Sequence, residues 1–227
     1  MKRILKCEGN SWIKGLFFLL FMALVSNSAY AYQPRAVFSA KHPFSNPVVI
    51  INPEVSKIYY GQLTGDADYY RIDSRRHYQL YLNIMVPDRK ISRLDMTVDV
   101  IADNKALLRL KGKGYIWERF FDPLARDRYL KGPDLDWRLR QGTYYIKVYN
   151  KGNLGKYSLS VGVREPFSPL ETLKTAFILP GIKARFFNKP AYCAFLSPFG
   201  LILLAYLSVA GVFVFWIRRI LRQYVIR

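Results

Sequence analysis

The sequence predicts a mainly β protein: an antiparallel β-sandwich followed by one C-terminal transmembrane helix. Three observations predict this fold class. Between residues 48 and 163 apolar side chains alternate with polar ones, as they do in half-buried strands. Turn-forming residues separate the alternating segments, and no long amphipathic helix interrupts them. Near the C-terminus, an uncharged run of 20 residues is followed directly by arginines.

Composition limits the classes of protein that the chain can belong to. It has 227 residues, of which 51% are hydrophobic, so there is enough apolar material for a folded core. Lys and Arg number 35 against 16 Asp and Glu, which gives a formal net charge of +19. Two histidines and two cysteines are too few for a multi-histidine metal centre, an iron–sulfur cluster or a disulfide framework. We therefore expect no metal and no cofactor.

Residues 1–31 have the layout of a secretory signal peptide. Basic residues precede an apolar run over 15–25, and Ala29 and Ala31 are small residues at the two positions that a signal peptidase reads. Cleavage is expected after Ala31. An uncleaved anchor helix is the alternative, although the apolar run is short for a bilayer. Residues 32–47 are then an exported leader.

The β-sandwich is expected over residues 48–164. Its strands are predicted where apolar residues recur at every second position, so that one face of each strand lies on a core. The clearest alternating segments are Tyr78–Val86, Met96–Val100, Tyr144–Val148 and Tyr157–Val163.

Two segments of this domain resemble the bacterial pre-peptidase C-terminal (PPC) domain. The first is Gly61-Gln62-Leu63 with Gly65-Asp66-Ala67-Asp68-Tyr69-Tyr70-Arg71-Ile72. The second is Leu139-Arg140-Gln141-Gly142-Thr143-Tyr144-Tyr145-Ile146-Lys147-Val148, followed by Gly155-Lys156-Tyr157-Ser158-Leu159-Ser160-Val161. The resemblance covers about residues 57–163. It implies a jelly-roll-like sandwich that serves as an accessory or binding module and not as a catalyst.

The C-terminal uncharged run predicts a transmembrane helix over 197–217, because 20 residues at about 1.5 Å per residue span the hydrocarbon core of a bilayer. The basic tail 218–227 then lies in the cytoplasm by the positive-inside rule. A buried core helix and a sortase-type sorting signal are the alternatives. The residues expected to fix the anchor are Pro198, Trp216, Arg218, Arg219 and Arg222.

Residues 165–196 are expected to link the sandwich to the anchor. Ser168-Pro169-Leu170-Glu171 forms a capping box, and apolar residues at helical spacing follow it. A short amphipathic helix that lies against the bilayer or the sandwich is therefore predicted, ending at Pro180-Gly181. Lys183, Arg185 and Lys189, which alternate with aromatic residues, suit either the headgroup layer of a membrane or an ordinary structured linker.

Basic and aromatic residues between 105 and 131 predict a binding surface for an anionic glycan or lipid headgroup, because such ligands need cations and aromatic faces. A solvated basic surface without a partner is the alternative. Nucleic acid is not expected, since the domain is predicted to be exported. The candidate ligand-binding residues are Lys111, Lys113, Tyr115, Trp117, Arg126 and Arg128.

Catalytic motifs are missing from the sequence. It contains no nucleophile elbow, no HExxH and no P-loop. Asp134 and Asp136 offer only a weak basis for a hydrolase. Asp66 and Asp68 can be read as calcium ligands, but turn capping is favoured because two carboxylates are few for calcium.

The leading hypothesis from the sequence is therefore a non-catalytic protein of the cytoplasmic membrane. Its sandwich faces the periplasmic or extracellular side, and it acts as an accessory subunit beside a membrane-protein partner and the lipid bilayer.

Overall fold

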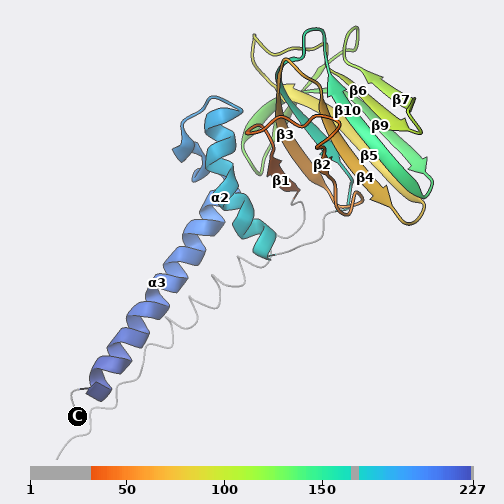
Figure 1. Cartoon of the computed structure of the whole chain (residues 1–227). Coiled ribbons are helices and arrows are strands. Elements are labelled where there is room, and N and C mark those ends of the chain that lie inside the picture. Colours follow the sequence, from red (N-terminus) through yellow and green to blue (C-terminus); the bar gives the residue numbers. More distant parts are fainter. Residues whose placement is uncertain (1–31, 165–168, 226–227) are drawn as a thin grey trace, which may run out of the picture. The chain divides into compact units, whose positions relative to one another are not determined.

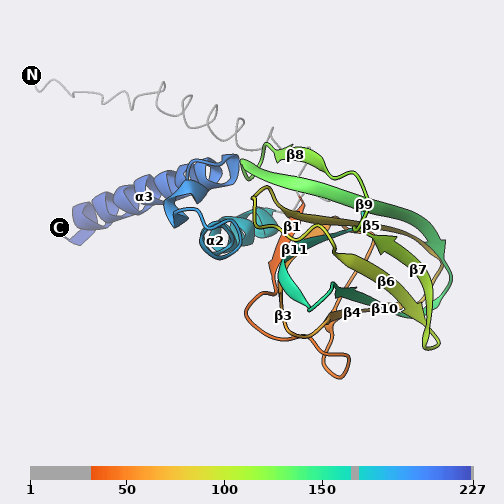
Figure 2. The ribbon, with the colours of Figure 1, turned by 90° about the horizontal axis from the view of Figure 1, so that it is seen from above.

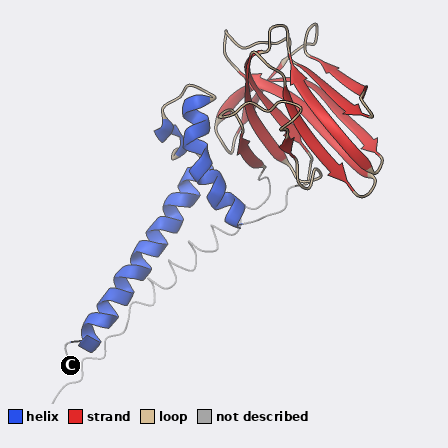
Figure 3. Cartoon of the chain, viewed as in Figure 1, coloured by secondary structure: helices blue, strands red, loops and turns tan. Residues whose placement is uncertain are grey.

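The computed structural model describes residues 32–164 and 169–225 and contains two β-sheets that form a sandwich (Figure 1). The sheets lie as two layers (Figure 2), and the helices among the described residues all follow the last strand (Figure 3). The six-stranded sheet contains, in spatial order, β1 (Gln33–Ala36), β3 (Lys57–Thr64), β11 (Leu154–Val161), β5 (Tyr78–Pro87), β9 (Asp127–Leu139) and β8 (Glu118–Asp122). The five-stranded sheet contains β2 (Val48–Val49), β4 (Asp68–Ser74), β10 (Gly142–Tyr149), β6 (Thr97–Ala102) and β7 (Lys105–Lys111).

Both sheets are mixed, which corrects the expectation of a purely antiparallel sandwich. Strand β1 pairs with β3 in parallel, and β2 pairs with β4 in parallel. Each parallel strand is short and lies at one edge of its sheet. Strand β1 falls within residues 32–47, where no strand was expected, because only four residues pair and too few alternate to give a periodic signal.

The core between the sheets confirms the alternation seen in the sequence. The inward-facing residues of β5, β6, β10 and β11 are buried and form one cluster. Val163 is an exception and is exposed, because β11 ends at Val161 and the chain turns at Gly162 with a φ of 76°.

The outer face of the six-stranded sheet carries a second buried cluster. Helix α2 (Pro169–Arg185) lies beside this sheet (Figure 2). The helix and the two phenylalanines after it pack against Tyr60 and Tyr129, whose hydroxyls are 2.8 Å apart. The helix continues through Pro180 and does not end there. Leu179 and Ile182, on either side of the proline, are buried, and this packing offsets the hydrogen bond that a proline removes. The 3₁₀ helix η1 (Ala191–Ala194) follows.

The expected transmembrane helix over 197–217 is wrong. Among the residues that the structure describes, no helix combines the length and the apolar character needed to cross a membrane. Helix α3 (Pro198–Val225) does not stop before the arginines, so Pro198, Trp216, Arg218, Arg219 and Arg222 all lie within one helix. Its first turns serve packing inside the protein, since Phe199 and Leu203 are buried. The uncharged run in the sequence therefore includes residues that pack inside the protein as well as residues further along helix α3.

The chain divides into two compact units within helix α3. Residues 31–204, with both sheets, α2 and the start of α3, form one unit, and α3 from residue 205 onward belongs to the other. The predicted signal peptide, residues 1–31, lies outside the described residues.

Candidate ligand-binding groove

The hairpin between β8 and β9 begins the candidate site. Asp122 ends β8, and its Oδ1 accepts hydrogen bonds from the backbone N–H groups of Leu124 (2.9 Å) and Ala125 (3.2 Å). The hydroxyl of Tyr32 donates to the other carboxylate oxygen. Burial raises the pKa of Asp122, although these hydrogen bonds partly oppose that shift. The carboxylate thus fixes the turn that carries Arg126.

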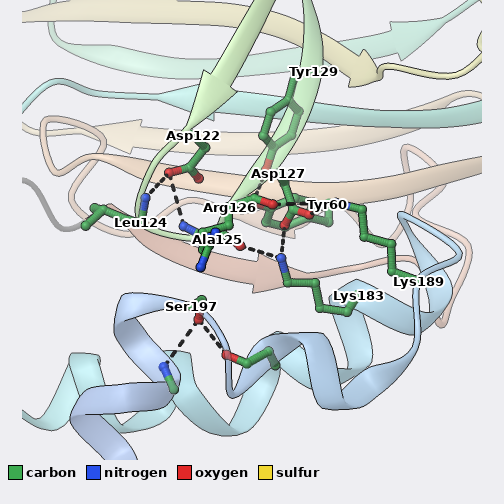
Figure 4. A network of polar contacts seen from close by, with 12 residues as sticks. Tyr60, Asp122, Leu124, Ala125, Arg126, Asp127, Tyr129, Lys183, Lys189 and Ser197 are labelled. Atoms are coloured by element: carbon green, nitrogen blue, oxygen red, sulfur yellow. Dashed lines mark hydrogen bonds and ion pairs between the residues drawn. The ribbon is translucent and has the colours of Figure 1, made fainter.

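Asp127 lies at the other end of this turn and is fully buried (Figure 4). Lys183 Nζ lies 2.6 Å from its Oδ2, and Lys189 Nζ lies 2.8 Å from its Oδ1. Lys183 also donates to the carbonyl oxygen of Ala125, and its side chain is only 1% exposed. Burial lowers the pKa of Lys183, while Asp127 acts in the opposite direction. One carboxylate therefore ties α2 and the segment after it to the hairpin.

A groove of about 610 Å³ opens beside this network. We call it the basic groove, and its lining residues are Asp88, Arg89, Phe121, Arg126, Arg128, Phe187, Asn188 and Lys189. Four of these carry positive charge and one carries negative charge. A neighbouring hollow of about 420 Å³ shares Asp88, Phe121 and Arg128 with it and adds Arg119 and Phe120.

The chemistry of the basic groove suits an anion that also has an apolar or ring-shaped part. Phe120 and Phe121 are exposed, so their rings are open to a ligand. Arg128 is exposed as well, whereas Lys189 is held in place by Asp127 and lies 5.4 Å from the centre of the Phe187 ring. Cations next to aromatic faces bind acidic groups by charge and flat or apolar groups by stacking.

The six candidate residues predicted from the sequence do not all meet in this groove. Arg126 and Arg128 line it, whereas Lys111, Lys113 and Tyr115 are exposed elsewhere. Trp117 has a structural role. Its Nε1 donates to the carbonyl oxygen of Gly112 (3.0 Å), and its ring covers Gly132, where a Cβ atom would lie 2.7 Å from the ring.

Six residues that line the groove are missing from the candidate set: Asp88, Arg89, Phe121, Phe187, Asn188 and Lys189. Arg89 belongs to a basic cluster that is visible in the sequence, and Lys189 follows a helical segment expected near lipid headgroups. They are about 100 residues apart along the chain, so only the packing of α2 on the sheet reveals that they line one groove. The same packing buries Lys183, Phe186 and Phe187 against the sandwich.

The carboxylates that the sequence offers for hydrolysis or calcium binding do not line the basic groove. Asp136 accepts a hydrogen bond from Gln79 (2.7 Å), and Asp134 lies 4.0 Å from Lys131. Asp68 is buried and accepts a hydrogen bond from Tyr157 (2.7 Å), while exposed Asp66 pairs with Lys41. Within the described ranges, no three residues with metal-ligating side chains gather into one site.

Comparisons with known proteins give distant structural likenesses. No family model and no curated protein matches the chain. Among solved structures, the pre-peptidase C-terminal domain of a collagenase from Bacillus anthracis is similar over 60% of this chain and 99% of that one, with 11% identity and a TM-score of 0.30. A β-glucosidase from Paenibacillus barengoltzii is similar over 58% of this chain and 13% of that one, with 10% identity and a TM-score of 0.25. TM-scores this low carry no argument, so the β-sandwich is established from the chain's own two sheets.

Proposed function

We propose that this protein is a non-catalytic binding module whose basic groove holds an anionic glycan. The observation that carries the proposal is the convergence of Arg89, Arg126, Arg128 and Lys189 beside an exposed Phe121. A glycan with carboxylate or sulfate groups offers charge to the cations and the apolar face of a sugar ring to the aromatic side chain. The predicted signal peptide supports a location outside the cytoplasm, where such glycans occur.

The test uses a heparin-derived oligosaccharide as the probe and two charge-matched double variants. Arg89→Gln/Arg128→Gln removes two cations from the groove, whereas Lys111→Gln/Lys113→Gln removes two cations outside it. The groove variant is expected to weaken binding about tenfold or more, since each lost charged contact contributes roughly 1.5–3 kcal/mol before solvent screening. The control variant is expected to change affinity less than about twofold, as screened surface charges do.

Equal losses of affinity in the two double variants would contradict binding in the groove. They would indicate binding to the basic surface as a whole. A groove-dependent binding to phosphatidylglycerol vesicles, with no binding of the oligosaccharide, would assign the groove to a lipid headgroup instead.

A second candidate function is that of an accessory subunit, and helix α3 favours it. Several large apolar side chains of this helix from residue 207 onward are exposed. Exposed apolar side chains on one element mark surfaces that bind other proteins. Those residues are Leu207, Val212, Phe213, Val214, Phe215, Ile217 and Leu221.

A photoreactive amino acid at position 213 tests this candidate by crosslinking in intact cells. One partner protein captured at a constant ratio would support it, and the absence of any reproducible crosslinked protein would contradict it.

A further inference from the structure

A second hollow, of about 1150 Å³, lies at the β2 edge of the sandwich and shares no lining residue with the basic groove. We call it the edge cleft. Its walls are formed by residues 49–55, which begin at the end of β2, by residues 73–76, which span the end of β4 and the turn after it, and by Tyr78 and Arg164. Its size is that of a cleft that accommodates a small molecule.

The cations of the edge cleft differ in how they are held. Glu54 accepts a hydrogen bond from Arg76 at 3.0 Å and from Arg164 at 2.9 Å, so these two arginines already have a carboxylate. Asp73 is likewise occupied, with Arg71 at 2.8 Å. Arg75 makes no side-chain hydrogen bond or ion pair with any residue in ranges 32–164 and 169–225. The cleft therefore has one cation available for an anion.

Tyr78 supplies an independent observation. Tyr78 is among the residues that line the edge cleft, is only 4% exposed, and has a buried hydroxyl without a hydrogen-bond partner among the described residues. The nearby Tyr144 hydroxyl donates to the carbonyl oxygen of Arg140. A buried hydroxyl without a partner is costly, and native structures rarely contain one without a reason. An acceptor atom of a bound ligand would supply the missing partner.

The remaining wall is apolar. Val49 and Ile51 line the edge cleft and are 50% and 70% exposed, and Val55 lies beside them. An apolar wall next to a free guanidinium and an unpartnered hydroxyl fits a molecule with two chemically different ends. We propose that the edge cleft binds a small aliphatic carboxylate. The chain of the ligand packs on Val49, Ile51 and Val55, and its carboxylate pairs with Arg75 and accepts a hydrogen bond from Tyr78.

The experiment titrates the full chain with octanoate by calorimetry and NMR, with octan-1-ol and acetate as comparison probes. Octanol has the chain without the charge, and acetate has the charge without the chain. Octanoate is expected to bind at least about tenfold more tightly than either, because it alone satisfies both ends of the cleft. Equal affinity for octanoate and octanol, or no octanoate binding, would overturn the proposal.

Two variants assign the binding to the edge cleft. Arg75→Gln is expected to weaken octanoate binding about fivefold to tenfold and to leave octanol binding unchanged, and Tyr78→Phe is expected to weaken octanoate binding by a similar factor. Their controls are Lys113→Gln and Tyr115→Phe, which remove a positive charge and a tyrosine hydroxyl at exposed sites elsewhere. Tyr78→Phe is expected to keep or raise the melting temperature, since it removes a hydroxyl that has no partner. Unchanged octanoate affinity in both cleft variants would contradict the assignment.

Discussion

At the scale of single residues, the buried carboxylate of Asp127 joins the two parts of the candidate site. It pairs with Lys183 and Lys189, which lie after the sandwich in the chain, while its neighbour Arg126 lines the groove. Two lysines share this carboxylate, and one of them, Lys189, also lines the groove. Removing the carboxylate would leave a buried ammonium without its counter-ion.

We predict that Asp127→Asn destabilises the protein by about 3–5 kcal/mol, because breaking a buried ion pair leaves an uncompensated charge. Urea unfolding measures this change. Asp134→Asn is the control. Its side chain is exposed, and its ion pair with Lys131 is long at 4.0 Å, so the free energy of unfolding is expected to change by less than about 0.5 kcal/mol. The double variant Asp127→Asn/Lys183→Met is expected to be more stable than Asp127→Asn alone. If Asp127→Asn were as stable as the wild type, the ion pair between Asp127 and Lys183 would contribute nothing to stability.

A second residue-scale prediction concerns pH and Lys57. Burial, with a smaller contribution from Arg35, lowers the pKa of Lys57 from 10.5 to about 8. Between these values the unfolded chain holds a proton that the folded protein has released, so the free energy of unfolding rises with pH in this window. Comparing urea unfolding of the wild type and Lys57→Met isolates this effect from other titrating groups. We expect the free energy of unfolding to rise less with pH in Lys57→Met than in the wild type. Identical pH profiles of the two proteins would contradict this prediction.

At the scale of secondary-structure elements, the sequence predicts most clearly the four strands whose inward-facing residues alternate with outward-facing ones, and the longest strand, β9, is not among them. Strands β5, β6, β10 and β11 follow their period of two because one face of each lies on the core. The short edge strands β1 and β2 carry no such signal, since two to four residues cannot establish a period. The sequence predicts helix α2 and allows it to lie against either the bilayer or the sandwich. It does not show which strand residues the helix covers, because Met85 and Tyr60 on the outer face resemble ordinary exposed strand residues in sequence.

The packing of α2 leads to a prediction about two phenylalanines. Phe186, directly after α2, is 1% exposed and lies edge-on to Tyr60 with ring centres 5.0 Å apart, whereas Phe177 on α2 is 69% exposed. Phe186→Ala is expected to cost about 3–5 kcal/mol, because it leaves a cavity between the helix segment and the sheet. Phe177→Ala is expected to cost less than about 1 kcal/mol. Thermal and urea unfolding measure the stability of both variants. Similar losses of stability would contradict the packing of Phe186 between the helix segment and the sheet.

At the scale of the whole molecule, the basic groove could be predicted only in part. Arg126 and Arg128 are visible as a basic cluster near exposed aromatic residues, and they do line it. Arg89 and Lys189 join them through β-pairing and helix packing between distant parts of the chain, which no local pattern encodes. The formal net charge of +19 is visible in the sequence, but it does not distinguish a groove from a uniformly basic surface.

Rates of association and dissociation separate the contribution of overall charge to binding from the contribution of contacts in the basic groove. Arg89→Gln/Arg128→Gln and Lys111→Gln/Lys113→Gln each remove two positive charges, so both are expected to slow association with the heparin-derived oligosaccharide by a similar factor. Long-range attraction depends on total charge and is screened within about 10 Å at 0.1 M salt. Dissociation depends on contacts in the bound state, so it is expected to become about tenfold faster only in the groove variant. Surface plasmon resonance at two salt concentrations measures both rates. Equally fast dissociation in both variants would mean that the ligand is held by overall charge and not by the groove.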